Sequence, residues 1–219
     1  MSIEVYSNLT RQEALDDSAI TDKAFLDIHR KMMPHLVLLD VDHLGYDGGM
    51  KRGQLVVHEA MRERFASAFA SLVELKYPIE QIRPMVAFGW SDALAMADNN
   101  TSIYRPDFIG NDPKTRSASE HTRGSAVDIN PLDNWLRNPD GSIEPVESMY
   151  RIPRGDVRIS GNLAVIEVFD ALGMEYGGYW PVSVHATDYY GPIVADNHHF
   201  ELRPNLVSEL YVPEGIWRK

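Results

Sequence analysis

Two short segments of this sequence concentrate the residue types that bind and activate a metal ion. Residues 119–128 read Ser-Glu-His-Thr-Arg-Gly-Ser-Ala-Val-Asp, and residues 196–201 read Asp-Asn-His-His-Phe-Glu. A catalytic zinc ion takes three protein ligands and keeps one position for water. Three side chains match that count: His121, Asp128 and His199. Asp196 remains as a base that could deprotonate the water, so the two segments predict a hydrolytic zinc site.

The composition narrows the chemistry of such a site. The 219 residues include no cysteine, which excludes disulfide scaffolds, thiolate nucleophiles and cysteine-ligated structural zinc. A metal site built from histidine and carboxylate is typical of catalytic rather than structural zinc.

The charge and the N-terminus limit the partners. A formal net charge of −11 argues against binding to nucleic acid, whose phosphates require a basic surface. No apolar run approaches the roughly 20 residues of a membrane helix, so we expect no membrane insertion. Residues 1–8 show no secretory signal. The expected location is therefore cytoplasmic, or periplasmic or extracellular if the chain is processed or delivered by a phage. The oligomeric state stays open.

The elements that must position these residues follow no regular alternation of strand and helix, which favours an α+β fold with a small antiparallel sheet and flanking helices. We expect an N-terminal helical extension over residues 1–34 and a single domain over 35–219. Helices are predicted at His58–Leu75 and Leu163–Leu172. Strands are predicted at His35–Asp42, Met85–Trp90, Gly124–Ile129 and His198–Leu202, and loops at 99–119 and 132–158.

Local geometry indicates how the candidate ligands could meet. Gly124 permits a positive φ or a close backbone approach, which would fold His121 and Asp128 toward one point. Strand periodicity places His199 and Glu201 on one face, with Phe200 pointing into the core. Periodicity alone does not choose between His198 and His199 as the ligand. Glu201 is either an orienting partner of a ligand imidazole or a surface charge.

The two motifs together resemble the zinc signature of the D-alanyl-D-alanine carboxypeptidase (VanY-like) metallopeptidases, which include L-alanyl-D-glutamate endopeptidases. The pattern is Ser119-x-His121-x-x-Gly124-x-Ala126-x-Asp128, with Asp196 three residues before His199. Further similarity extends over roughly residues 35–203, including the segments at 53–58, 99–102, 128–131 and 177–180. The resemblance implies the fold shared by hedgehog signalling domains and D-Ala-D-Ala peptidases.

The resemblance also implies roles for individual residues. His121, Asp128 and His199 would bind zinc, and Asp196 would be the general base. Arg105 would grip a substrate carboxylate, as a guanidinium does in a bidentate pair, and Ser119 would contact the substrate or brace its loop. The loop before Arg105 is shorter than in the members it most resembles. Residues 181–195 look like an insertion that forms either a lid over the site or a segment packed on the sheet.

The implied function is zinc-dependent hydrolysis of peptide bonds in peptidoglycan stem peptides. We expect a D-alanyl-D-alanine carboxypeptidase. The alternative is an L-alanyl-D-glutamate endopeptidase, which an aspartate rather than a glutamate as the base mildly favours. A non-catalytic zinc-binding interaction module is a third reading, against which Asp196 counts.

Overall fold

A computed structural model describes residues 4–5, 7–107, 118–138, 140–152, 154–180, 195–207 and 210. Within these residues, helices flank several small and mostly antiparallel sheets, so the predicted α+β class is confirmed. No helix in this part of the chain is both long and apolar enough to cross a membrane. The predicted insertion at 181–195 lies outside the described residues except for its last residue.

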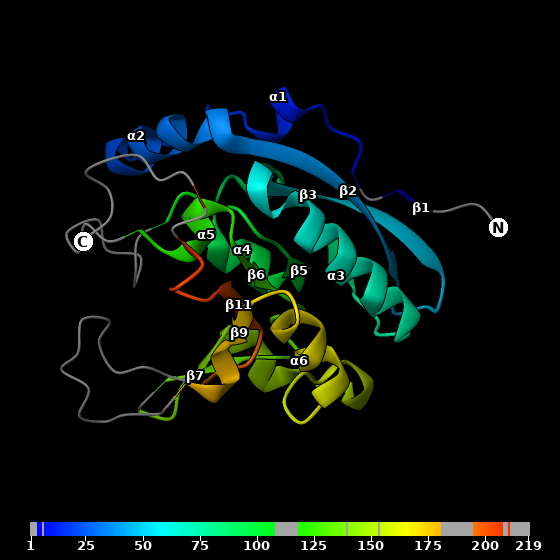
Figure 1. The fold of residues 1–219 in the computed structure, drawn as a ribbon. Coiled ribbons are helices and arrows are strands. Elements are labelled where there is room, and N and C mark those ends of the chain that lie inside the picture. The colour runs from blue at the N-terminus through cyan, green and yellow to red at the C-terminus, as the bar shows by residue number, and fades with distance from the viewer. Residues whose placement is uncertain are drawn as a thin grey trace.

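A long antiparallel hairpin forms the largest sheet (Figure 1). Strand β2 (Leu36–Leu44) pairs with β3 (Met50–His58) along the whole of both strands, and β1 (Glu4–Val5) joins β3 in parallel. The prediction located β2 but missed β3. From residue 53 onward β3 is buried continuously, so it lacks the alternation of apolar and polar residues that marks a half-exposed strand.

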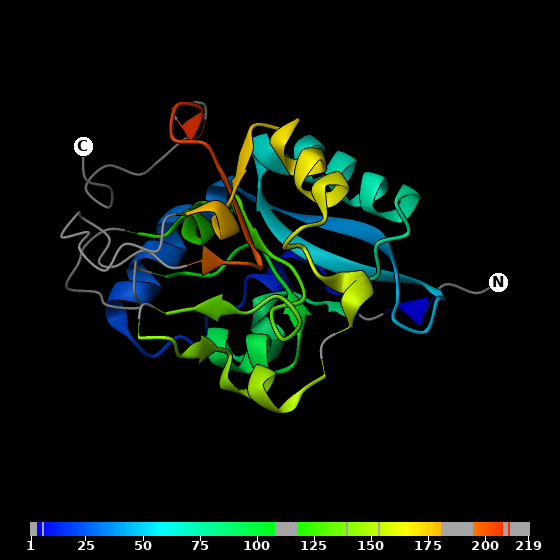
Figure 2. The ribbon, with the colours of Figure 1, turned by 90° about the horizontal axis from the view of Figure 1, so that it is seen from below.

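Helices cover both faces of this hairpin, as Figure 1 and Figure 2 show. On one side lie α1 (Arg11–Ala14) and α2 (Lys23–Met32), whose apolar residues pack around Val56. On the other side lies α3 (Arg62–Glu74), after a 3-10 turn, η2 (Glu59–Met61). Phe65, Phe69 and Leu72 of α3 are buried in the main core, whereas Leu75 just after its end is 44% exposed.

A second sheet contains two of the predicted metal ligands, Asp128 and His199. Its strand order is β6 (Ala126–Asp128), β11 (His199–Leu202) and β9 (Met174–Tyr176), all antiparallel. Helix α6 (Leu163–Asp170) supports it from the core side, where Phe169 stacks on Phe200 with ring centroids 4.1 Å apart. Because neighbouring side chains on a strand alternate, burying Phe200 turns His199 and Glu201 to the opposite face.

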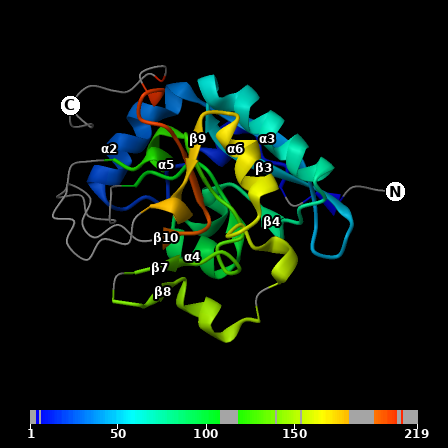
Figure 3. The same ribbon diagram turned by 60° about the horizontal axis from the view of Figure 1, so that its bottom comes forward.

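Short elements complete the fold. They are η1 (Met33–His35), β4 (Gln81–Ile82), η3 (Met85–Phe88), α4 (Asp92–Ala97), β5 (Asn100–Thr101), α5 (Glu120–Arg123), β7 (Leu136–Arg137), β8 (Ile143–Glu144), η6 (Val146–Tyr150), η7 (Gly155–Val157), η8 (Gly177–Tyr179) and β10 (Ala195–Asp196). Strand β7 lies between β10 and β8 (Figure 3).

Two of the local predictions were wrong. Met85–Trp90 is not a strand. Residues 85–88 form the 3-10 helix η3, and the two residues that follow, Gly89 and Trp90, both have positive φ, which ends the helix. The 132–158 segment is not only a loop, since it contains β7 and β8. These strands are two residues long, too short to produce a detectable alternation of apolar and polar residues.

Candidate metal centre

Pairing between β6 and β11 brings two of the predicted ligands together. Asp128 and His199 are register partners on these adjacent antiparallel strands. His121 comes from the four-residue helix α5, which ends at Gly124 with φ +69°. A Cβ at Gly124 would lie 2.5 Å from the backbone nitrogen of His58, so both the turn and the close approach require glycine. The predicted role of Gly124 is confirmed.

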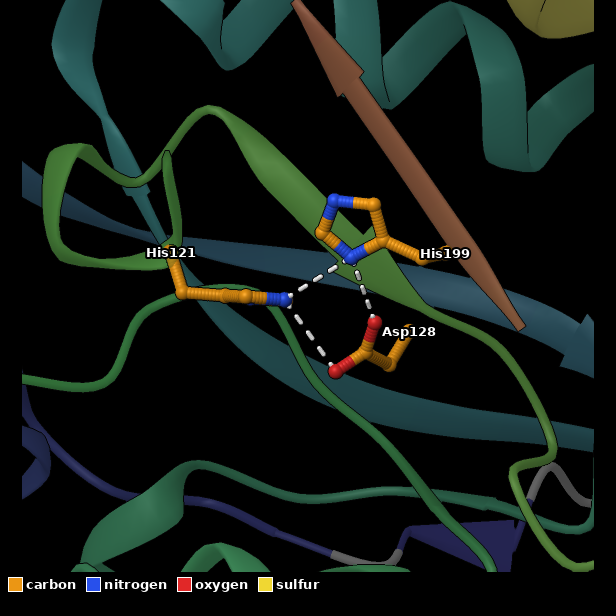
Figure 4. A group of neighbouring side chains, drawn as sticks. All are labelled: His121, Asp128 and His199. Atoms are coloured by element: carbon orange, nitrogen blue, oxygen red, sulfur yellow. Dashed lines mark hydrogen bonds and ion pairs between the residues drawn. The ribbon is translucent and has the colours of Figure 1, made fainter. Parts of the chain in front are cut away.

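The three side chains converge on one point (Figure 4). His121 Nε2 lies 3.1 Å from Asp128 Oδ2 and 3.2 Å from His199 Nδ1. His199 Nδ1 lies 2.9 Å from Asp128 Oδ1. Ligand atoms bound tetrahedrally to zinc at its usual bond lengths are about 3.3 Å apart. All three side chains are buried, so the spacing of the donor atoms fits a zinc ion.

The far nitrogen of each imidazole supports the same assignment. His121 Nδ1 donates to the carbonyl oxygen of Ile103 at 2.7 Å, which leaves the lone pair on Nε2 directed at the centre. His199 Nε2 donates to Glu201 Oε2 at 3.1 Å, and its Nδ1 faces the centre beside Asp128. Partners of this kind orient metal-bound histidines and set their tautomers. Of the two readings of Glu201, the contact favours the orienting one.

Burial and neighbouring charges set different protonation states for His121 and Asp128. Burial lowers the pKa of His121, and the Arg105 guanidinium lowers it further, so this imidazole is neutral as a ligand must be. Burial alone would raise the pKa of Asp128. The neighbouring His121 and Arg105 outweigh that effect and hold it well below its usual range. The Asp128 carboxylate is therefore anionic at neutral pH, as a metal ligand would have to be.

Asp196 lies in β10 and pairs with a side chain that sequence reasoning treated only as a rival ligand. His198 Nε2 is 3.0 Å from Asp196 Oδ1, and His198 Nδ1 donates to the carbonyl oxygen of Asn134 at 2.8 Å. Burial opposes ionisation of both partners, but their mutual attraction outweighs it. The pKa of Asp196 falls below its usual range and the pKa of His198 rises to about 9.

His198 therefore pairs with Asp196, and its Nε2 also lies 3.8 Å from Asp128 Oδ1, whereas His199 directs Nδ1 at the point where the three candidate ligands converge. The register of β11 decides between them, because Asp128 is opposite His199. The only sequence signal for the role of His198 is its closeness to Asp196, and its carbonyl partner at Asn134 comes from a segment 64 residues away.

Arg105 lies at the centre but is already engaged by carboxylates. Its Nη1 is 2.7 Å from Asp128 Oδ2 and 3.2 Å from Asp92 Oδ1, and its Nε is 3.3 Å from Asp107 Oδ2. The side chain is 11% exposed. These contacts support Asp128 and compete with any substrate carboxylate for the guanidinium.

Ser119 precedes α5 as its N-cap residue, yet its hydroxyl makes no capping hydrogen bond. The hydroxyl oxygen is buried and has no hydrogen-bond partner among the described residues. Its backbone is tied to Asp107, to whose carbonyl oxygen the Ser119 amide donates at 3.3 Å. The backbone amide of Ser119 therefore braces the loop, and the hydroxyl makes no hydrogen bond to the described residues.

Trp180 forms a wall of the centre that sequence reasoning did not assign. Its ring centroid is 5.2 Å from that of His199, and its Nε1 donates to Glu175 Oε1 at 3.2 Å. The tryptophan follows η8, where Gly177 packs against the backbone of Asp196. The Gly-Gly-Tyr-Trp segment at 177–180 was the available signal.

A comparison with known protein families found a match that includes this site. Residues 113–202 match a protein-family model, and the match supports a peptidase. The model is described as D-alanyl-D-alanine carboxypeptidase, so the predicted resemblance to this family is confirmed over the matched residues. The matched segment contains the three candidate ligands and Asp196, whereas Arg105 lies before it. No curated protein and no solved structure matched the chain.

The His198–Asp196 pair predicts a specific dependence of stability on pH. Because the pKa of His198 in the folded protein is about 9, above its unfolded value, the pair stabilises the fold fully below about pH 6.5. That contribution disappears as the pH rises through about 9. We expect the unfolding free energy of the chelator-treated wild type to fall over this window, and that of His198→Gln to fall less. Urea unfolding at pH 6 and pH 9.5 measures both, and parallel curves would contradict the assignment.

Proposed function

We propose that this chain is a zinc-dependent peptidase that cleaves peptide bonds in peptidoglycan stem peptides. The family match supports the coarser statement, a peptidase acting on peptidoglycan. The observation that carries the zinc assignment is the convergence of His121, Asp128 and His199. In each imidazole, the nitrogen that faces away from the centre is hydrogen-bonded to an oxygen. That arrangement is expected of a metal centre, because partners of this kind orient metal-bound histidines.

The reaction can be followed through the chain's own residues. A zinc ion held by His121, Asp128 and His199 would polarise the scissile carbonyl and lower the pKa of a water molecule. Asp196, ionised at neutral pH, would accept a proton from a water molecule as the water oxygen bonds to the scissile carbonyl carbon. It then donates this proton to the departing amine as the peptide C–N bond breaks. His198 holds the Asp196 carboxylate in place between these two transfers.

The bond that is cut depends on Arg105. The family description and the expected arginine clamp favour a carboxypeptidase that removes a C-terminal D-alanine. The contacts of Arg105 with Asp92, Asp107 and Asp128 favour the second candidate, an endopeptidase whose substrate brings no free carboxylate to this point. The three contacts use Nη1 and Nε, and a fourth carboxylate at Nη2 would add further negative charge to a buried cluster of carboxylates.

Product analysis separates the two candidates. Purified muropeptides that end in D-alanyl-D-alanine are incubated with the zinc-loaded protein, and the products are identified by mass spectrometry. Loss of single alanine residues would support the carboxypeptidase. Release of stem peptide from the sugar-linked alanine would support the endopeptidase, which is the outcome expected if Arg105 remains bound to its three carboxylates. Intact muropeptides after incubation would contradict the proposed function.

A further inference from the structure

The chain segment that leads into Arg105 contacts two of the three candidate ligands. Ser102 and Asp128 are joined by two backbone hydrogen bonds, at 3.1 and 3.0 Å. The carbonyl oxygen of Ile103 accepts from His121 Nδ1, and Arg105 Nη1 lies 2.7 Å from Asp128 Oδ2. The position of this segment therefore sets the orientation of His121 and Asp128.

Tyr104 anchors the segment to the N-terminal extension. Its side chain is buried in the apolar cluster that α1 and α2 form on the hairpin, whereas Ile103 belongs to the main core. Because Tyr104 lies between Ile103 and Arg105 in the chain, its anchorage limits how far the Ile103 carbonyl and the Arg105 side chain can move.

The partner of the Tyr104 hydroxyl is His29 of α2, which is fully buried. His29 Nε2 lies 3.1 Å from the carbonyl oxygen of Leu15, which can only accept, so this nitrogen carries the proton. His29 Nδ1 is then the acceptor for the Tyr104 hydroxyl, at 2.9 Å. Burial lowers the pKa of His29, which favours the neutral form that this arrangement requires. One imidazole therefore joins α2 and the end of α1 to the segment before Arg105.

Trp90 packs against both partners of this hydrogen bond. Its ring centroid is 4.8 Å from that of His29 and 6.0 Å from that of Tyr104. Its indole N–H donates at 2.9 Å to a carbonyl oxygen of the chain between α1 and α2. Asp92, two residues after this tryptophan, lies 3.2 Å from Arg105 Nη1. The N-terminal extension therefore reaches Arg105 by a second route.

The same helix also supports the segment that carries His121. Helices α2 and α5 lie next to each other (Figure 1 and Figure 3). Ile28 of α2 packs against Ala118, and His121 follows in α5. The extension therefore contacts both of the segments that place His121 and Arg105 at the centre.

We propose that His29 is a positioning residue for the metal centre, acting through Tyr104 on the Ile103 carbonyl and the Arg105 side chain. This inference rests on the proposed function, because it concerns the centre assigned to zinc. His29 and Tyr104 both lie before residues 113–202, the segment that matches the family model, so the match itself gives them no role.

Two substitutions at His29 separate its two hydrogen bonds. Asparagine places an amide oxygen near the position of Nδ1 and keeps an acceptor for Tyr104, whereas glutamine places an amide nitrogen near the position of Nε2 and keeps a donor for Leu15. We expect His29→Gln to weaken zinc binding about tenfold, the lower end of the range for losing a group that orients a ligand. His29→Asn should bind zinc more tightly than His29→Gln. Competition with a chelator measures these affinities without any substrate.

Tyr104→Phe removes the other partner of the same hydrogen bond and keeps the ring. It should weaken zinc binding by the same factor as His29→Gln. The double variant should bind zinc no more weakly than either single variant, because two residues that act through one contact are not additive.

Asp22→Ala is the control for a loss of stability alone. The Asp22 side chain caps α2 by accepting from the backbone amides of Ala24 and Phe25, so its removal destabilises the same helix and leaves Tyr104 bonded to His29. Urea unfolding should show that loss, while the zinc affinity stays at the wild-type value. Equal weakening of zinc binding by Asp22→Ala and His29→Gln would overturn the positioning role.

The outcomes for the positioning role and for the proposed function differ. Weaker zinc binding by His29→Gln, in a protein that hydrolyses no muropeptide, would uphold the positioning role and contradict the proposed function. Wild-type zinc affinity in His29→Gln, in a protein that does hydrolyse muropeptides, would do the reverse. A wild type that binds no zinc would contradict both.

Discussion

Replacing Asp196 with asparagine is expected to lower kcat by about 10²- to 10⁴-fold while the zinc content stays at the wild-type level. Asparagine preserves the shape of the side chain but cannot accept a proton from water, and general-base catalysis is worth about that factor. Asp196 is not one of the three converging donors, so the metal should remain. Hydrolysis of purified muropeptides and metal content by mass spectrometry measure the two effects separately.

Asp140→Asn is a matched control, because Asp140 is an exposed aspartate whose contacts are with Ser142 in its own turn. It should leave both kcat and zinc content unchanged. If Asp196→Asn hydrolysed muropeptides as fast as the wild type, Asp196 would not be the base. If neither protein hydrolysed them although both held zinc, the reading of the chain as a non-catalytic zinc-binding module would be favoured.

Replacing His121 with alanine is expected to remove zinc and activity together. One of three protein ligands is lost, and the Asp128 carboxylate loses a partner at 3.1 Å. The loss of affinity should exceed the roughly 10- to 100-fold cost of removing a partner that only orients a ligand. Glu201→Gln supplies that comparison within the same centre, since Glu201 accepts from the outer nitrogen of His199. Zinc affinity measured by competition with a chelator should therefore rank wild type, Glu201→Gln and His121→Ala in descending order.

The control for this series is His35→Ala, which removes the last residue of η1, outside the cluster of converging donors. Its zinc affinity should equal that of the wild type. Retention of one zinc ion per chain by His121→Ala, with the wild-type affinity, would show that the metal does not bind at this cluster.

Much of the architecture was predictable because its signals are local. The helix α3 follows from apolar residues at three- and four-residue spacing, and β2 from a run of branched residues. The turn at Gly124 follows from the conformational freedom of glycine. The helix α4 and the continuously buried strand β3 were missed, as was the true form of Met85–Phe88, because short or fully buried elements lack a clear periodicity.

The sequence by itself determined which residue types could form the centre, since the spacing of His121 and Asp128 and that of Asp196 and His199 are properties of two short segments. Only the tertiary structure decided how the segments combine. The register of β11 against β6 sets His199 opposite Asp128 and leaves His198 to hold Asp196. The packing of Arg105 against three carboxylates, and of Trp180 between His199 and a cavity, depends on chain segments far apart in sequence. Contacts of that kind form only when distant segments fold together, so they cannot be predicted from local periodicity.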